Sequence, residues 1–157
     1  KLYSGGGAMN RWSPLRGIPG PEGLGPLDPA DGWPGGFAQS LEARAVEVDA
    51  GTGRFWLRTD VPLVADEQIS AVARAFTVID VTNGMAPRVS SRVASYPNLD
   101  LTVHLFREPR DGWIGFDKSS VLGAGGVGIT RSTLHDADGA FGTSEQILTV
   151  RMQDPRP

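Results

Sequence analysis

Apolar and polar residues alternate in several short segments, and residues 98–106 are the clearest case. There Leu99, Leu101, Val103 and Leu105 fall on one side of an extended chain, with polar residues between most of them. Because successive side chains of a strand point to opposite faces, this pattern predicts a half-buried strand. Similar segments bounded by turn residues predict further strands at 37–48, 54–59, 113–121, 127–135 and 140–152.

One segment has a helical pattern instead. Its apolar residues recur at the spacing of one helix face: Ile69, Val72, Ala73, Phe76 and Ile79. The pattern predicts a helix over residues 68–82. Asp66 or Ser70 is placed to cap its start, and Asn83-Gly84 supplies a stop before a loop.

The predicted order is two strands, one helix and four strands in an antiparallel meander. With only one helix available, the apolar face of the sheet must pack against that helix. A sheet wrapped around one long helix is the hotdog fold, an α+β architecture. We place this domain at residues 37–152, followed by a short tail at 153–157.

Residues 1–36 differ from the rest of the chain. They hold nearly half of the 21 glycines and half of the 12 prolines. Such a segment cannot sustain a helix and loses a backbone donor at each proline, so it predicts a linker or an arm along the surface. Trp12 and Trp33 favour the arm, and we expect both indoles to dock against the domain or its partner.

Composition excludes several classes of function. The chain has no cysteine, which excludes disulfides, zinc–thiolate sites and cysteine nucleophiles, and fits a cytoplasmic location. A net charge of −3 with a pI of about 5.3 argues against nucleic-acid binding. No apolar run approaches the ~18 residues of a membrane span. His104 and His135 are far apart without ligand spacing, so no metal site is predicted.

Three stretches carry a family likeness. They are residues 76–84 (FTVIDVTNG), residues 98–107 (NLDLTVHLFR), and residues 128–151, which run from GITRS through an Asp-Gly turn to EQILTVR. In this order and spacing they resemble the C-terminal hotdog of the acyl-CoA thioesterase II-like family, in its actinobacterial type. The resemblance covers about three quarters of the chain. Because the chain opens on Lys1 and lacks the family's N-terminal hotdog, we expect it to be a fragment or a processed piece.

The resemblance implies a hydrolase of acyl-CoA or a related thioester that needs no cofactor. In the family, an acid at the helix end, a hydroxyl residue opening the next strand and a glutamine in the last strand hold and activate a water. Asp80 matches the acid and Gln146 matches the amide, but the hydroxyl position is occupied by Asn98. Asparagine can hold a water but cannot relay a proton as a hydroxyl does. Thr102, further along the same predicted strand face, could supply the hydroxyl only if the water sits deeper.

Candidates for substrate contact are Asn83, Gly84, Thr102 and Arg88, the last through the phosphates of coenzyme A. Each candidate also has a plain structural reading, as a solvated polar residue or a surface ion pair. For Asp80 we favour the functional interpretation. A carboxylate in the last turn of a helix lowers the stability of an exposed helix by ~0.3–1 kcal/mol, so selection for stability alone would place a cation there.

The alternative function is a non-catalytic acyl-binding or structural hotdog half that completes a partner domain. The asparagine at position 98 and the missing first hotdog both favour it. A hotdog hydratase would require an Asp/His pair in a segment that is not found here. Because a lone hotdog leaves sheet edges unpaired, we expect a homodimer or pairing with a second hotdog half.

Overall fold

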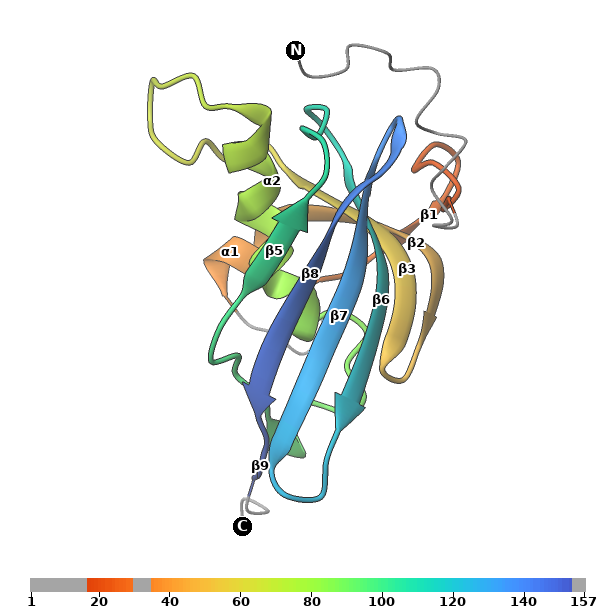
Figure 1. Cartoon of the computed structure of the whole chain (residues 1–157), viewed down its shortest axis with the longest axis vertical. Helices are drawn as coiled ribbons and strands as arrows, with labels where there is room; N and C mark the ends of the chain where they lie inside the picture. Colours follow the sequence, from red (N-terminus) through yellow and green to blue (C-terminus); the bar gives the residue numbers. More distant parts are fainter. Residues whose placement is uncertain (1–16, 30–34, 154–157) are drawn as a thin grey trace.

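The structure is a computed structural model that describes residues 17–29 and 35–153 (Figure 1). In chain order its elements are β1 (Gly25–Leu27), α1 (Gly36–Gln39), β2 (Leu41–Asp49), β3 (Thr52–Thr59), α2 (Ala71–Ile79), the 3₁₀ helix η2 (Asp80–Asn83), β4 (Ala94–Ser95), β5 (Thr102–Leu105), β6 (Ile114–Leu122), β7 (Val127–Asp136), β8 (Gly139–Thr149) and β9 (Arg151–Met152).

Seven strands form one antiparallel sheet in the order β1-β2-β3-β6-β7-β8-β5, and β4 pairs with β9 in a second small sheet. Figure 1 shows α2 lying against one face of the large, twisted sheet. The predicted α+β hotdog architecture is therefore confirmed, with the single long helix packed against the strands.

The hydrophobic core lies between α2 and the sheet. Ala75, Val78 and Ile79 of the helix are buried against apolar side chains of β2, β3, β6, β7 and β8. Phe55 and Phe116, on adjacent strands, stack with their ring centroids 5.3 Å apart. Burial of this apolar surface holds the helix in place and so fixes where its C-terminal end meets the strands.

The predicted apolar face of the helix is wrong in part. Of its five residues only Ile79 is fully buried, while Phe76 is 42% exposed. Ala75 and Val78 take the buried positions instead. The helix is apolar on almost every side, so its sequence pattern is compatible with more than one buried face, and packing against the sheet selects among them.

Both ends of the helix follow the sequence signals. The Ser70 hydroxyl caps the start by accepting a hydrogen bond from the Ala73 N–H at 3.1 Å. The α-helix ends at Ile79, and the chain continues as the 3₁₀ turn η2, in which the Gly84 N–H bonds to the Val81 carbonyl at 3.0 Å. This tighter turn carries Asp80 at its first position.

The predicted four-strand meander is also wrong. Strands β6, β7 and β8 form a meander, but β5 crosses to the far edge and pairs with β8, leaving β3 to pair with β6. Gly142 permits the close approach of β5, since a Cβ there would lie 2.5 Å from the His104 carbonyl oxygen. Consecutive strands pair only about two-thirds of the time, and here the helix intervenes between β3 and β5.

The segment predicted as an arm contributes to the sheet. Strand β1 pairs with β2, and the Pro19 carbonyl accepts a hydrogen bond from the Trp56 indole at 2.7 Å. The predicted strand at 37–48 begins later than expected, because α1 precedes β2. The division at residue 36 stays a prediction, and Trp12 and Trp33 lie outside the described residues.

A layer of polar side chains is buried beneath the C-terminal end of α2. It includes Lys118, Ser120, Thr130, Ser132, Ser144 and Gln146 from the strands, and Thr82 and Asn83 from η2. Burial lowers the pKa of the Lys118 amine to about 8, and its Nζ donates to the Ala86 carbonyl at 2.9 Å. Within this layer, Gln146 bonds to η2 and Lys118 bonds to the following loop, and these two contacts tie both segments to the sheet.

Candidate active site

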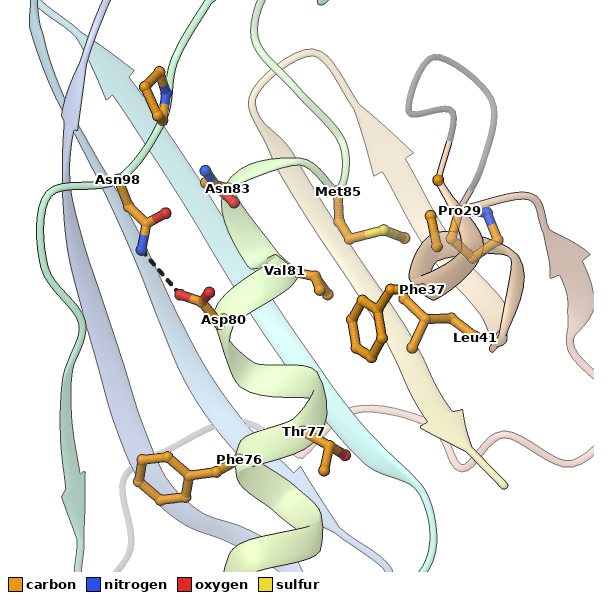
Figure 2. A pocket seen from close by; sticks show the side chains of 13 residues that line it. Pro29, Phe37, Leu41, Phe76, Thr77, Asp80, Val81, Asn83, Met85 and Asn98 are labelled. Carbon is orange, nitrogen blue, oxygen red and sulfur yellow. Dashed lines mark hydrogen bonds between the residues drawn. The ribbon is translucent and has the colours of Figure 1, made fainter. Parts of the chain in front are cut away.

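Asp80, Asn98 and Gln146 meet at the end of α2. One carboxylate oxygen of Asp80, Oδ1, accepts hydrogen bonds from Asn98 Nδ2 at 2.9 Å and from Gln146 Nε2 at 3.1 Å. No hydrogen bond from the described residues reaches the other oxygen, Oδ2. Figure 2 shows the Asp80 and Asn98 side chains pointing toward one another. The carboxylate is thus held by one oxygen and open at the other.

The Gln146 side chain lies beneath this carboxylate and is 1% exposed. Its Nε2 also donates to the backbone carbonyl of Asp80 at 2.9 Å, and its Oε1 accepts from the Thr82 hydroxyl at 2.9 Å. Both amide protons and the amide oxygen therefore have protein partners. Gln146 is placed to orient Asp80 and not to hold a water directly.

Asn98 reaches the site from a segment that is not a regular strand. The strand predicted at 98–106 shrinks to β5, and Asn98 makes only an isolated bridge to Leu148. The Asp100 carboxylate accepts a hydrogen bond from the Ile147 N–H at 2.8 Å, and the Asp100 carbonyl accepts one from Asn98 Nδ2 at 3.3 Å. The first contact fastens the segment to β8, and the second holds the Asn98 amide that also bonds to Asp80.

A mostly apolar cavity of about 570 Å³ opens beside the Asp80 carboxylate. Aromatic, aliphatic and thioether side chains make up much of its lining (Figure 2), and among them are Phe37, Leu41, Phe76, Val81 and Met85. Asn83 and Asn98 also line it, beside Asp80. A cavity with apolar walls and a few polar groups gathered at one side suits a ligand with a hydrocarbon part and one reactive polar group.

Of the other predicted substrate contacts near η2, Asn83 lines the cavity, whereas Gly84 and Arg88 do not. Asn83 lines the cavity and is buried; its Nδ2 donates to the Tyr96 carbonyl at 3.2 Å, while its Oδ1 has no partner among the described residues. Gly84 follows η2 and is not one of the lining residues. Arg88 is exposed, and its side-chain stem packs beside Gly51 in the β2–β3 turn, outside the lining.

Thr102 lies on the other face of the sheet. It pairs with Glu145, the neighbour of Gln146, and paired residues of antiparallel strands share a face while neighbours alternate. Thr102 and His104 line a separate polar hollow with Asp117 and Arg131. The expectation that Asn98 and Thr102 share a face is therefore wrong, because the chain is irregular between them.

Several residues of the site were missed by the sequence reasoning. Thr82 contacts Gln146, and its only sequence signal is its position two residues after Asp80. Phe37 and Met85 line the cavity from segments predicted as a strand and a loop. Phe76 also lines it, although its apolar spacing predicted a core position.

A comparison with protein-family models shows which family the chain belongs to. Residues 21–150 match the model of the acyl-CoA thioesterase C-terminal domain. The chain belongs to this family. The match includes Asp80, Asn98 and Gln146, and it begins before the boundary predicted at residue 37. None of the curated proteins matches the sequence.

Several solved structures share the fold of this chain. Acyl-CoA thioesterase II TesB2 from Mycobacterium marinum is 21% identical, with a TM-score of 0.63 over 89% of this chain and 56% of that one. A putative thioesterase from Novosphingobium aromaticivorans is 23% identical, with a TM-score of 0.59 over 89% and 55%. A hotdog protein of unknown function from Alicyclobacillus acidocaldarius is 15% identical, with a TM-score of 0.61 over 92% and 56%. The chain thus spans a little over half the length of these proteins.

Two further observations concern metal binding and membrane-spanning helices. Across residues 17–29 and 35–153, no group of three or more histidine, aspartate or glutamate side chains is arranged to hold a metal ion. Within the same residues, no helix is long and apolar enough to cross a membrane.

Proposed function

We propose that this domain hydrolyses an acyl thioester of the acyl-CoA class, with Asp80 as the general base. The observation that carries the proposal is the Asp80 carboxylate at the edge of an apolar cavity. It is held through Oδ1 by two amide donors, and no described residue donates a hydrogen bond to its Oδ2. Membership of the acyl-CoA thioesterase C-terminal domain family supports the same reaction class.

In the proposed reaction, a water lies between Asp80 Oδ2 and the Asn98 amide oxygen. Asp80 takes one proton as the water oxygen bonds to the thioester carbonyl carbon. The C–S bond then breaks, and the proton passes from Asp80 to the leaving thiolate, which gives a carboxylic acid and a free thiol. A general base of this kind contributes about 10²–10⁴-fold to the rate.

The substrate is expected to lie with its acyl chain in the cavity. Phe37, Leu41 and Met85 offer apolar contact to the chain. The buried Oδ1 of Asn83 has no donor among the described residues, so an N–H or O–H of the substrate that reached it would relieve the cost of an unpaired buried acceptor. Gly84, Thr102 and Arg88 do not line this cavity, so we assign them no role in the proposed binding.

Release of free thiol from a series of acyl-CoAs tests this function. We expect measurable turnover with medium-chain and long-chain acyl-CoAs and a much lower kcat/KM with acetyl-CoA, because a short acyl group leaves the apolar cavity unfilled. Equal turnover across the series would contradict the proposed seat of the acyl chain. No turnover with any of them would contradict the proposed activity.

The alternative, a non-catalytic acyl-binding or structural half, is supported by one feature of the site. Asn98 stands where the family resemblance places a hydroxyl residue. In that case the chain would bind acyl-CoA without releasing thiol, and its activity would depend on another hotdog half. A cytoplasmic location stays a prediction from the absence of cysteine.

We also propose that the domain associates, either with a copy of itself or with a second hotdog half. Strand β5 ends the sheet, and the apolar side chains of Leu99, Leu105, Phe106 and Ile147 on and beside this edge are exposed, Phe106 at 55% and Leu99 at 68%. An edge strand with apolar neighbours invites pairing with another chain. Light scattering at micromolar concentration should therefore give a mass above 16.7 kDa for the chain alone or after mixing with the partner half. A monodisperse mass near 16.7 kDa in both samples would refute association.

A further inference from the structure

We propose that Thr82 is a positioning residue for the hydrolysis, holding the Gln146 amide in the orientation that aligns Asp80. The proposal rests on the function proposed above. It concerns a side chain that lies two residues beyond the general base and is fully buried, at 0% exposure.

The Thr82 hydroxyl has two acceptors within reach. The Ile79 carbonyl lies 3.0 Å away, a contact that threonine commonly makes with its own helix. Gln146 Oε1 lies 2.9 Å away on β8, which is 64 residues distant in sequence. The second contact is not a requirement of the helix, so it points to a role at the sheet.

Among the described residues, Thr82 is the only side chain or backbone donor to Gln146 Oε1. The other end of the same amide donates to both the carbonyl and the carboxylate of Asp80, at 2.9 and 3.1 Å. The three residues therefore form a directed chain, in which Thr82 fixes Gln146 and Gln146 fixes Asp80.

Reversal of the Gln146 amide would bring its oxygen against two oxygens of Asp80, where no proton lies between them. In the observed orientation Thr82 satisfies the amide oxygen, so the NH₂ group stays on Asp80. Without the hydroxyl, Oε1 would be buried with no donor, and the amide would be held only through its NH₂ contacts to Asp80, so it would move more freely. The donor to Asp80 Oδ1 would then be less precisely placed, and so would the carboxylate that it holds.

The test compares Thr82→Val, which removes the hydroxyl at nearly constant volume, with Thr82→Ser, which keeps it. We expect kcat for acyl-CoA to fall about tenfold in T82V, equivalent to ~1.4 kcal/mol, with KM unchanged, and to stay within about twofold of wild type in T82S. In a Gln146→Leu background, adding T82V should cause no further loss, because the positioned group is gone.

The matched control is Thr59→Val. Thr59 is also buried, and its hydroxyl donates to the Ser40 carbonyl at 3.1 Å, away from Asp80. We expect T59V to keep the wild-type kcat. If T82V does not fold, Thr82→Ala, which also lacks the hydroxyl, takes its place in the comparison.

A second readout does not require activity. The side-chain NH₂ signals of Gln146, assigned in ¹⁵N spectra by their loss in Q146L, should exchange slowly with solvent in wild type and at least about tenfold faster in T82V. Unchanged kcat and unchanged exchange in T82V would overturn the positioning role. If wild type releases no thiol from any acyl-CoA, the proposed function fails, and the exchange rates alone decide whether Thr82 holds Gln146.

Discussion

Replacing Asp80 with asparagine is expected to lower the rate of thioester hydrolysis by about 10²–10⁴-fold, because the change removes the proton acceptor at nearly constant volume. The asparagine oxygen can still accept the hydrogen bonds from Asn98 and Gln146. Asp80 is exposed and lies at the negative end of the α2 dipole, so losing its charge should leave stability unchanged or raise it by ~0.3–1 kcal/mol. Thiol release and thermal unfolding measure the two effects.

Asp60→Asn is the matched control for this variant. Asp60 is an exposed carboxylate just after β3, and no hydrogen bond joins its side chain to the described residues. We expect D60N to hydrolyse acyl-CoA as wild type does. If D80N retained the wild-type kcat, Asp80 would not be the base, and another group would have to activate the water.

Replacing Arg107 with methionine is expected to destabilise the fold by about 3–5 kcal/mol, the usual cost of leaving a buried charge without its partner. Arg107 makes two parallel hydrogen bonds of 2.6 Å to the Asp136 carboxylate, whose side chain is 0% exposed. The remaining donors to this carboxylate would be the backbone N–H groups of Arg110 and Asp138. Since domains of this size are stable by about 5–15 kcal/mol, chemical denaturation should resolve the loss easily.

This loss should depend on pH in a defined direction. Burial opposes the charged form of Asp136, but Arg107 and the two backbone donors outweigh it and lower the pKa of the carboxyl below its ordinary value of 3.8. The stabilising contribution is therefore complete above that value and disappears as the pH falls through the lower pKa of the folded state. In R107M only burial and the two N–H groups remain, so the deficit relative to wild type should shrink as the pH falls below the ordinary pKa of 3.8 and Asp136 becomes protonated.

Arg110→Met controls for the loss of a cation in the same loop. Its exposed pair with Asp138 should contribute less than about 1 kcal/mol, and the variant keeps the backbone N–H that serves Asp136. Equal unfolding free energies for R107M and R110M, or a deficit in R107M that does not change with pH, would contradict this account of the buried pair.

The sequence predicted that Asp80, Asn98 and Gln146 lie close together, because each occupies a recognisable position in a predicted helix or strand. Asp80 ends an apolar helical segment, Asn98 opens an alternating one, and Gln146 lies in the last strand. The family motifs suggested that the three residues act together, and the structure brings their side chains within hydrogen-bond distance. Their catalytic roles stay predictions until they are measured.

The rest of the site depends on tertiary packing that local pattern does not encode. Polar and apolar residues alternate from Asn98 to Leu105, but the chain forms a regular strand only from Thr102 onward. Counting every second residue from Asn98 therefore predicted the wrong face of the sheet for Thr102. Phe76 fits a core stripe by spacing, but it borders the cavity because the sheet covers Ala75 and Val78 instead. The contact between Thr82 and Gln146 joins elements whose relative position only the crossover of β5 and the packing of α2 determine.

The central claim, that Asp80 activates a water for direct attack on a thioester, is tested most directly by a single turnover in H₂¹⁸O. The assembled protein in excess over a long-chain acyl-CoA is quenched after one turnover, and the acid and the peptide containing Asp80 are weighed by mass spectrometry. The account predicts one ¹⁸O in the released acid, an unlabelled Asp80, and release of acid by D80N that is slower by about 10²–10⁴-fold. An unlabelled acid together with ¹⁸O in Asp80, or no release of acid by the wild-type protein, would contradict it.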